Sequence, residues 1–114
     1  MVEDNEPVRR LMHGILVQSG YRVLVAPDGQ DALKVCQDYA GRIDLVLSDV
    51  IMPGLSGPDM MGHISEMRPE ARVLFMSGYA ETDGSDLHSS YDNHLAKPFT
   101  PAGLLDKVRE VLRR

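Results

Sequence analysis

The chain has 114 residues, of which 43% are hydrophobic and 25% charged, the composition of one globular domain. Its formal net charge of −5 argues against direct binding to nucleic acid. No apolar run is long enough to cross a bilayer, so we expect no membrane contact by this chain. The single cysteine, Cys36, has no internal partner for a disulfide, which favours a reducing, cytoplasmic compartment. We expect one domain over residues 1–114.

Short apolar runs alternate with amphipathic segments along the chain. The runs are rich in Val and Leu and predict buried strands. They cover Tyr21–Ala26, Asp44–Val50, Arg72–Gly78 and His94–Lys97.

Between these runs, apolar residues recur at helical spacing. Asp28 is a candidate N-cap for one helix, and Thr100 with Pro101 opens the last one. The helical patterns run from Val8 to Leu16, from Ala32 to Ala40, over Gly57–Met67, over the polar Ala80–Tyr91 and from Leu104 to Leu112.

This alternation predicts an α/β fold, a doubly wound parallel sheet with helices on both faces. The first strand is the exception, because only Met1 and Val2 precede the acidic pair Glu3–Asp4. A buried central strand needs about five residues. We therefore expect the first strand to be truncated at its N-terminus and the natural domain to begin several residues earlier. The alternative is that a shortened strand suffices.

Ligands of open parallel sheets bind at the carboxyl ends of the strands. In this sequence the first strand ends at Glu3 and Asp4, and the third ends at Asp49. Ser77 ends the fourth strand and Lys97 the fifth. Three carboxylates, one hydroxyl and one ammonium are thus expected at one edge.

Three carboxylates in one cleft repel each other unless they bind protons or share a cation. A hard divalent ion with oxygen ligands, Mg²⁺ or Mn²⁺, removes this repulsion. An ionised carboxylate such as Asp49 can then attack phosphorus. Lys97 and Ser77 supply a charge and a donor for the phosphoryl oxygens. The residue types therefore match those that phosphoryl transfer needs.

Four motifs occur in a characteristic order: the acidic pair within VEDNEPVR, then SDVIMPGLSG, LFMSGYA and LAKPF. With them the sequence resembles the receiver domains of two-component response regulators over essentially its whole length. The resemblance implies a flavodoxin-like, five-stranded sheet of order 2-1-3-4-5. It also implies a phosphoacceptor switch that catalyses only its own phosphorylation and dephosphorylation, so the domain is not expected to be an enzyme.

The resemblance assigns a role to each residue near the metal. Asp49 would be the phosphoacceptor and a metal ligand. Asp4 would bind the metal directly and Glu3 through a water. The backbone carbonyl of Ile51 would be a further ligand.

The resemblance also assigns the switch. Ser77 would turn toward the phosphoryl group, and Lys97 would pair with Asp49 or its phosphate. Lys97–Pro98 matches a peptide bond that is commonly cis in the family. His94 stands where the family usually has an aromatic residue, and an imidazole titrates near neutrality. The output surface would be the face formed by the fourth helix, the last strand and the fifth helix.

The implied partner is a histidine kinase or a phosphotransfer domain. SGYA and the terminal LLDKVREVLRR resemble receivers attached to hybrid sensor kinases, so the chain is either a stand-alone receiver or a module of a larger protein. In a hybrid kinase, the kinase activity would lie outside this chain.

Three other functions remain open. A metal-dependent phosphohydrolase would need a second aspartate two residues after Asp49, where this chain has Ile51. A flavodoxin-like binding module would place its phosphate beside Glu3 and Asp4, which would repel it. A degenerate receiver would act only by binding protein, although the acidic set is intact.

Overall fold

A computed structural model describes residues 1–52, 54–77, 94–96 and 99–113. The predicted helix Ala80–Tyr91 and the Lys97–Pro98 step lie outside these residues. The descriptions below concern the described residues alone.

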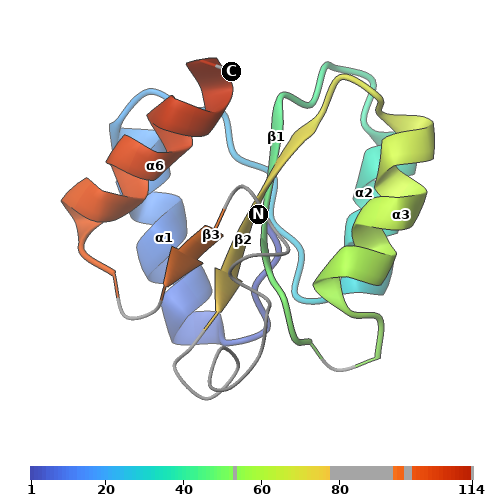
Figure 1. Ribbon diagram of the computed structural model, residues 1–114, viewed down its shortest axis with the longest axis horizontal. Coiled ribbons are helices and arrows are strands. Elements are labelled where there is room, and N and C mark those ends of the chain that lie inside the picture. Colours follow the sequence, from blue (N-terminus) through green and yellow to red (C-terminus); the bar gives the residue numbers. More distant parts are fainter. Residues whose placement is uncertain (53, 78–93, 97–98, 114) are drawn as a thin grey trace.

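Three parallel strands form the centre of the molecule (Figure 1). They are β1 (Leu45–Asp49), β2 (Arg72–Ser77) and β3 (His94–Ala96), in the order β1-β2-β3. In the register of β1 and β2, Asp49 lies beside Met76. Each of the three strands lies within a run that the sequence predicts to be a strand.

Two extended segments continue the sheet beyond β1. Val2 forms parallel bridges with both Ala26 and Ser48, so the segments follow in the order Ala26, Val2, β1, β2, β3. This is the predicted spatial order. However, Tyr21–Ala26 is extended without being a strand, which corrects the prediction. A strand needs a continuous ladder with its neighbour, and the N-terminal segment offers Ala26 a single bridge.

Within the described residues, four helices cover the two faces of the sheet (Figure 1). On one face lie α1 (Glu6–Gln18) and α6 (Pro101–Arg113), and on the other lie α2 (Gly29–Asp38) and α3 (Gly57–Met67). The doubly wound arrangement follows the prediction as far as the described residues go.

The predicted helix starts at Asp28 and Thr100 are confirmed. The side chain of Asp28 accepts a hydrogen bond of 2.8 Å from the N–H of Asp31. That of Thr100 accepts one of 2.9 Å from the N–H of Gly103. Each side chain satisfies an N–H group that has no partner within the helix.

Each face of the sheet has its own apolar core. The core between the sheet and α2/α3 includes the buried Cys36. Its members include Val2, Val46, Met60, Ile64 and Phe75. The core between the sheet and α1/α6 includes Met12, Leu47, Leu74, Leu104 and Val108. Strands covered on both faces explain why their sequences read as continuous apolar runs.

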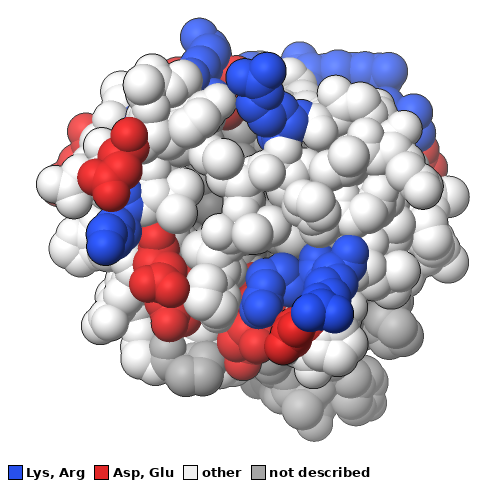
Figure 2. All heavy atoms as spheres, turned by 180° about the vertical axis from the view of Figure 1, so that it is seen from behind, with Lys and Arg blue, Asp and Glu red and all other residues white. Residues whose placement is uncertain are grey.

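On the surface, charges of opposite sign lie close together. Arg10 pairs with Glu6 on α1 and Arg109 with Asp106 on α6, each at 2.7 Å. Figure 2 shows Lys and Arg side chains beside Asp and Glu side chains on the face turned away in Figure 1. Within the described residues, the helices are too short or too polar to span a membrane.

Gly57 allows α3 to begin directly against the end of β1. Its N–H donates to the carbonyl of Val50 at 2.8 Å. A Cβ atom at this position would lie 2.3 Å from the carbonyl oxygen of Asp49 and 3.1 Å from the ring of Phe75. The backbone oxygen cannot move without disturbing the strand end.

We therefore expect Gly57→Ala to lower the free energy of unfolding by about 1–3 kcal/mol, measured by urea denaturation. Gly62→Ala on the same helix is the matched control. Nothing lies within 4 Å of its added Cβ, so it should raise stability by up to about 1 kcal/mol. Equal effects of the two substitutions would contradict the role of the close contact.

Candidate functional site

The carboxyl ends of the strands hold an acidic cluster. Glu3, Asp4 and Asp49 each offer a carboxylate oxygen, and these three oxygens lie within 4.8 Å of one another. The structure therefore brings together the three acids that the sequence places at this edge. The roles predicted for them individually remain predictions.

Backbone pairing of the N-terminal segment positions this cluster. The N–H of Val2 donates to the carbonyl of Leu47 at 2.7 Å, and the N–H of Asp49 donates to the carbonyl of Val2 at 3.4 Å. On the other side, the N–H of Glu3 donates to the carbonyl of Ala26 at 3.2 Å. The segment is thus held between two neighbours, and its two acids emerge beside the end of β1.

Arg9 supports the acidic turn from α1. Its guanidinium donates to the backbone carbonyl of Glu3 at 2.8 Å. The turn also contains Asn5, whose side chain caps α1 by accepting a hydrogen bond of 3.1 Å from the N–H of Val8. Neither residue was expected at the site. Asn5 could have been found as a cap before an amphipathic helix, whereas the contact of Arg9 has no local sequence signal.

The three acids differ in exposure. Asp49 is 3% exposed and Glu3 is 1% exposed, whereas Asp4 is exposed. Buried carboxylates lose hydration, and three negative charges this close repel strongly. A divalent cation with hard oxygen ligands offsets both costs, and Mg²⁺ is commonly held by one or two carboxylates with waters in the remaining positions. The donor set therefore fits Mg²⁺ or a similar ion.

The backbone after Asp49 is fixed by its neighbours. The hydroxyl of Ser48 donates to the carbonyl of Asp49 at 2.8 Å. The N–H of Val50 donates to the carbonyl of Met76 at 3.0 Å. Ile51 follows in the turn with its side chain 56% exposed. Its carbonyl stays a predicted metal ligand.

Ser77 ends β2 with its side chain fully buried. Its hydroxyl shares a hydrogen bond with Nε2 of His94, at the start of β3. The structure thus joins the two residues predicted to form the switch. Lys97, the predicted partner of Asp49, lies outside the described residues.

Comparison with known proteins decides the family. The family model described as "Response regulator receiver domain" matches residues 1–109. The chain belongs to this family. It has the two-component receiver fold, which the solved relatives share.

One curated relative of this receiver is the sensor kinase CckA of Brucella abortus. It is 35% identical over 119 residues, which cover 100% of this chain and 12% of the kinase. Another is the uncharacterized transcriptional regulatory protein YrkP of Bacillus subtilis, 35% identical over 100% of this chain and 48% of that protein. This receiver therefore spans less than half the length of these relatives.

Solved structures show the same similarity. The receiver domain from hybrid histidine kinase CckA has a TM-score of 0.81 at 37% identity, covering 97% of this chain and 94% of that one. A receiver domain protein from Clostridium thermocellum has a TM-score of 0.85 at 25% identity, covering 99% and 91%.

The acidic cluster predicts a divalent-metal affinity that depends on Asp4. Because Asp4 is exposed, Asp4→Asn should leave the fold intact while removing a charged oxygen ligand. We expect Mg²⁺ to bind at least about tenfold more weakly, measured by calorimetric titration.

Glu6→Gln is the control for this prediction, since Glu6 is a nearby exposed acid that pairs with Arg10. It should change Mg²⁺ affinity little. If both substitutions weakened binding equally, general electrostatic attraction rather than ligation by Asp4 would account for the effect.

Proposed function

We propose that this receiver is a phosphoacceptor switch in which Asp49 accepts a phosphoryl group from a histidine kinase or a phosphotransfer domain. The observation that supports this most is the cluster of Glu3, Asp4 and Asp49, with carboxylate oxygens within 4.8 Å. Two buried acids beside a third carry a high electrostatic and desolvation cost. A divalent cation would offset this cost and would assist a reaction at Asp49.

In the proposed reaction, a carboxylate oxygen of Asp49 attacks the phosphorus of a phosphohistidine. The new bond joins this oxygen to phosphorus while the phosphorus–nitrogen bond breaks. The electron pair of the broken bond stays on the imidazole of the partner, which leaves as neutral histidine or takes up a proton from solvent. The product is an acyl phosphate on Asp49.

Residues of this chain would position the reaction. Asp4 and Asp49 would hold Mg²⁺ directly, Glu3 through a water and Ile51 through its carbonyl. The ion supplies positive charge to the phosphoryl oxygens. Burial of Asp49 limits water around the carboxylate, and electrostatic interactions are stronger where water is excluded.

The remaining phosphoryl oxygens would be met by Ser77 and Lys97. Ser77 lies at the end of β2, next to the strand that carries Asp49. Its hydroxyl is engaged by His94 in the structure, so it must exchange this partner for a phosphoryl oxygen. This exchange would couple phosphorylation to the release of His94.

The output surface of this proposal is the face that includes β3 and α6, where His94 begins β3. A change at His94 would alter this face, which the fourth helix of the sequence prediction would complete. The partner that recognises the face would then distinguish the two states of Asp49.

The similarity to CckA supports a finer proposal, that this receiver is the receiver module of a hybrid kinase. In that case the kinase activity lies in another part of the protein. The phosphohydrolase alternative is less well supported, because Ile51 occupies the position of its second aspartate.

The chemical test uses acetyl phosphate as the phosphodonor, with intact-mass detection. We expect one added phosphoryl group per chain, with Mg²⁺ required. Asp49→Asn should abolish the addition, because an amide is a far poorer nucleophile than a carboxylate. Modification that persisted in this variant would falsify the assignment of Asp49.

Asp44→Asn is the matched control. Asp44 immediately precedes β1, at the opposite end from Asp49, and pairs with Arg42 at 2.6 Å on the surface. Its loss should leave phosphorylation unchanged. Steady release of inorganic phosphate at many turnovers would instead favour the phosphohydrolase.

The switch is tested by NMR of the imidazole nitrogens. Phosphorylation should shift the Nε2 resonance of His94, because its hydrogen bond to Ser77 is lost. The resonance of His63, an exposed residue of α3, should stay in place.

Ser77→Ala supplies the second comparison. It should produce the free-imidazole resonance of His94 without phosphorylation. A His94 resonance that is the same with and without phosphoryl on Asp49 would contradict the exchange of partners.

A further inference from the structure

Arg9 reaches back from α1 to the turn that carries two of the acids. It is the fourth residue of the helix and half-buried, and its guanidinium donates to the backbone carbonyl of Glu3 at 2.8 Å. Helical side chains lean toward the N-terminus of their helix, which brings that carbonyl within reach of a long side chain at this position. The bond goes to a backbone oxygen, so it does not use a carboxylate oxygen of the cluster.

The peptide unit held by Arg9 sets the direction in which the chain enters Asp4. The carbonyl of Glu3 and the N–H of Asp4 belong to the same planar unit, so a bond at the oxygen orients the whole unit. On the preceding side, the N–H of Glu3 is held by the carbonyl of Ala26 at 3.2 Å, and on the following side the helix begins after its cap, Asn5. Asp4 lies exposed between these anchors. The place of its carboxylate therefore depends on the orientation of this peptide.

Electrostatic attraction alone does not explain a cation at this position. A guanidinium is always protonated in proteins, and a positive charge beside a metal site repels a divalent ion. Hydrogen bonds from ionised donors are roughly twice as strong as those between neutral groups. What Arg9 offers the site is therefore a strong, directed hydrogen bond, whereas its charge opposes metal binding.

We propose that Arg9 is a positioning residue for the divalent ion: by holding the carbonyl of Glu3, it keeps the carboxylate of Asp4 close to that of Asp49. The arrangement in which the three carboxylate oxygens lie within 4.8 Å of one another includes this hydrogen bond. Residues that orient metal ligands without touching the ion change metal affinity by about 10- to 100-fold when they are replaced. The inference rests on the proposed function, because it concerns the ion that would assist phosphorylation of Asp49.

Replacement of Arg9 by Met separates geometry from charge through the sign of the effect. Arg9→Met keeps an unbranched apolar stem and removes both the donor and the charge. Loss of the positive charge alone would tighten Mg²⁺ binding, whereas loss of the hydrogen bond should weaken it. We expect Mg²⁺ to bind at least about tenfold more weakly, measured by calorimetric titration of the folded chain.

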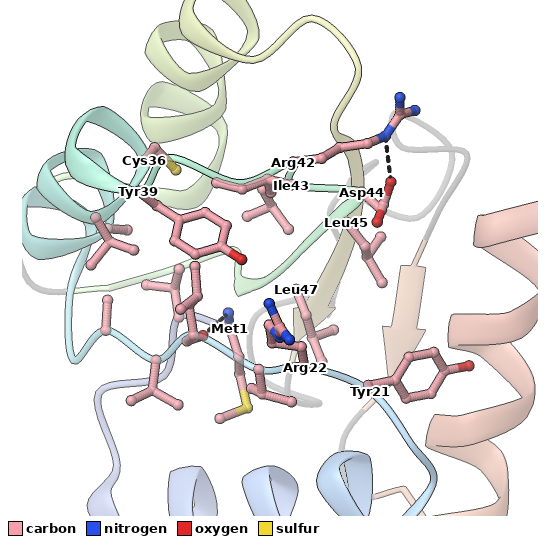
Figure 3. Close-up of a pocket in the computed structure, with 18 of the residues that line it drawn as sticks. Met1, Tyr21, Arg22, Cys36, Tyr39, Arg42, Ile43, Asp44, Leu45 and Leu47 are labelled. Carbon is pink, nitrogen blue, oxygen red and sulfur yellow. Dashed lines mark hydrogen bonds and ion pairs between the residues drawn. The ribbon is translucent and has the colours of Figure 1, made fainter.

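Arg10→Met and Arg42→Met are the matched controls, because each removes the same charge and leaves the hydrogen bond to the acidic turn in place. Arg10 is exposed on the same helix and pairs with Glu6 at 2.7 Å. Arg42 pairs with Asp44 at 2.6 Å just before β1, at the end of that strand away from the acidic cluster (Figure 3). Neither substitution should weaken Mg²⁺ binding, and Arg10→Met should tighten it slightly, because a nearby positive charge is lost.

A second readout needs no metal. The carbonyl carbon of Glu3 is bonded to the amide nitrogen of Asp4, so loss of the hydrogen bond in Arg9→Met should shift the NMR resonances of both nuclei. In Arg10→Met the two resonances should stay close to their positions in the unaltered chain. A role of Arg9 in stability alone would lower the melting temperature without changing the Mg²⁺ affinity of the folded chain.

Phosphorylation by acetyl phosphate supplies the third readout. Arg9→Met should need at least about tenfold more Mg²⁺ to reach half of its maximal rate, because fewer chains hold the ion at a given concentration. The maximal rate at saturating Mg²⁺ should change little, since the substitution leaves Asp49 itself unaltered.

Mg²⁺ binding by Arg9→Met that equals or exceeds that of the unaltered chain would overturn the inference and leave the proposed function standing. No Mg²⁺ binding by the unaltered chain would overturn both. Arg9→Lys carries the test if Arg9→Met does not fold. It keeps the charge on a shorter stem, so its Mg²⁺ affinity should fall in the same direction but less far, and an unchanged affinity would then overturn the inference.

Discussion

Val2 makes hydrogen bonds to β1 through both of its peptide groups, from its N–H to Leu47 and from Asp49 to its carbonyl. These bonds set the register in which Glu3 and Asp4 lie beside Asp49. A shift by one residue would turn the side chains of Glu3 and Asp4 to opposite faces. The acidic cluster therefore rests on a pairing of very few residues, and Ala26 and Arg9 reinforce it from the other side.

The carboxyl ends of the strands bury several polar residues. At the carboxyl ends, Glu3, Ser48, Asp49 and Ser77 are buried polar residues, an arrangement that lowers stability unless cations and hydrogen bonds compensate. Under the proposed function, the proximity of these acids would serve reactivity.

The hydrogen bond between Ser77 and His94 connects the site to its surroundings. It joins β2 to β3, so under the proposed function a change at Asp49 would have a direct route to the face that includes α6. The imidazole of His94 can either keep or lose its hydrogen bond to the Ser77 hydroxyl. These are two states of the kind that a local charge can bias. Under the proposed function, the coupling through His94 would therefore include a hydrogen bond as well as packing.

Local sequence determined the strands β1 and β2, the amphipathic helices, the caps at Asp28 and Thr100 and the gathering of three acids at one edge. The strands, helices and caps depend on side-chain period and on neighbours within four residues, which a sequence displays directly. The gathering of the acids follows from their places at strand ends, because the carboxyl ends of parallel strands share one edge. Only the tertiary structure decided the fate of Tyr21–Ala26, whose pattern is that of a strand. A strand is defined by its pairing with a neighbour, and the described pairing of this segment is a single bridge between Ala26 and Val2. The tertiary structure likewise decided that Glu3 is buried while Asp4 is exposed, that Arg9 holds the turn and that Ser77 meets His94, because each depends on contacts between distant segments or on the path of the chain in space.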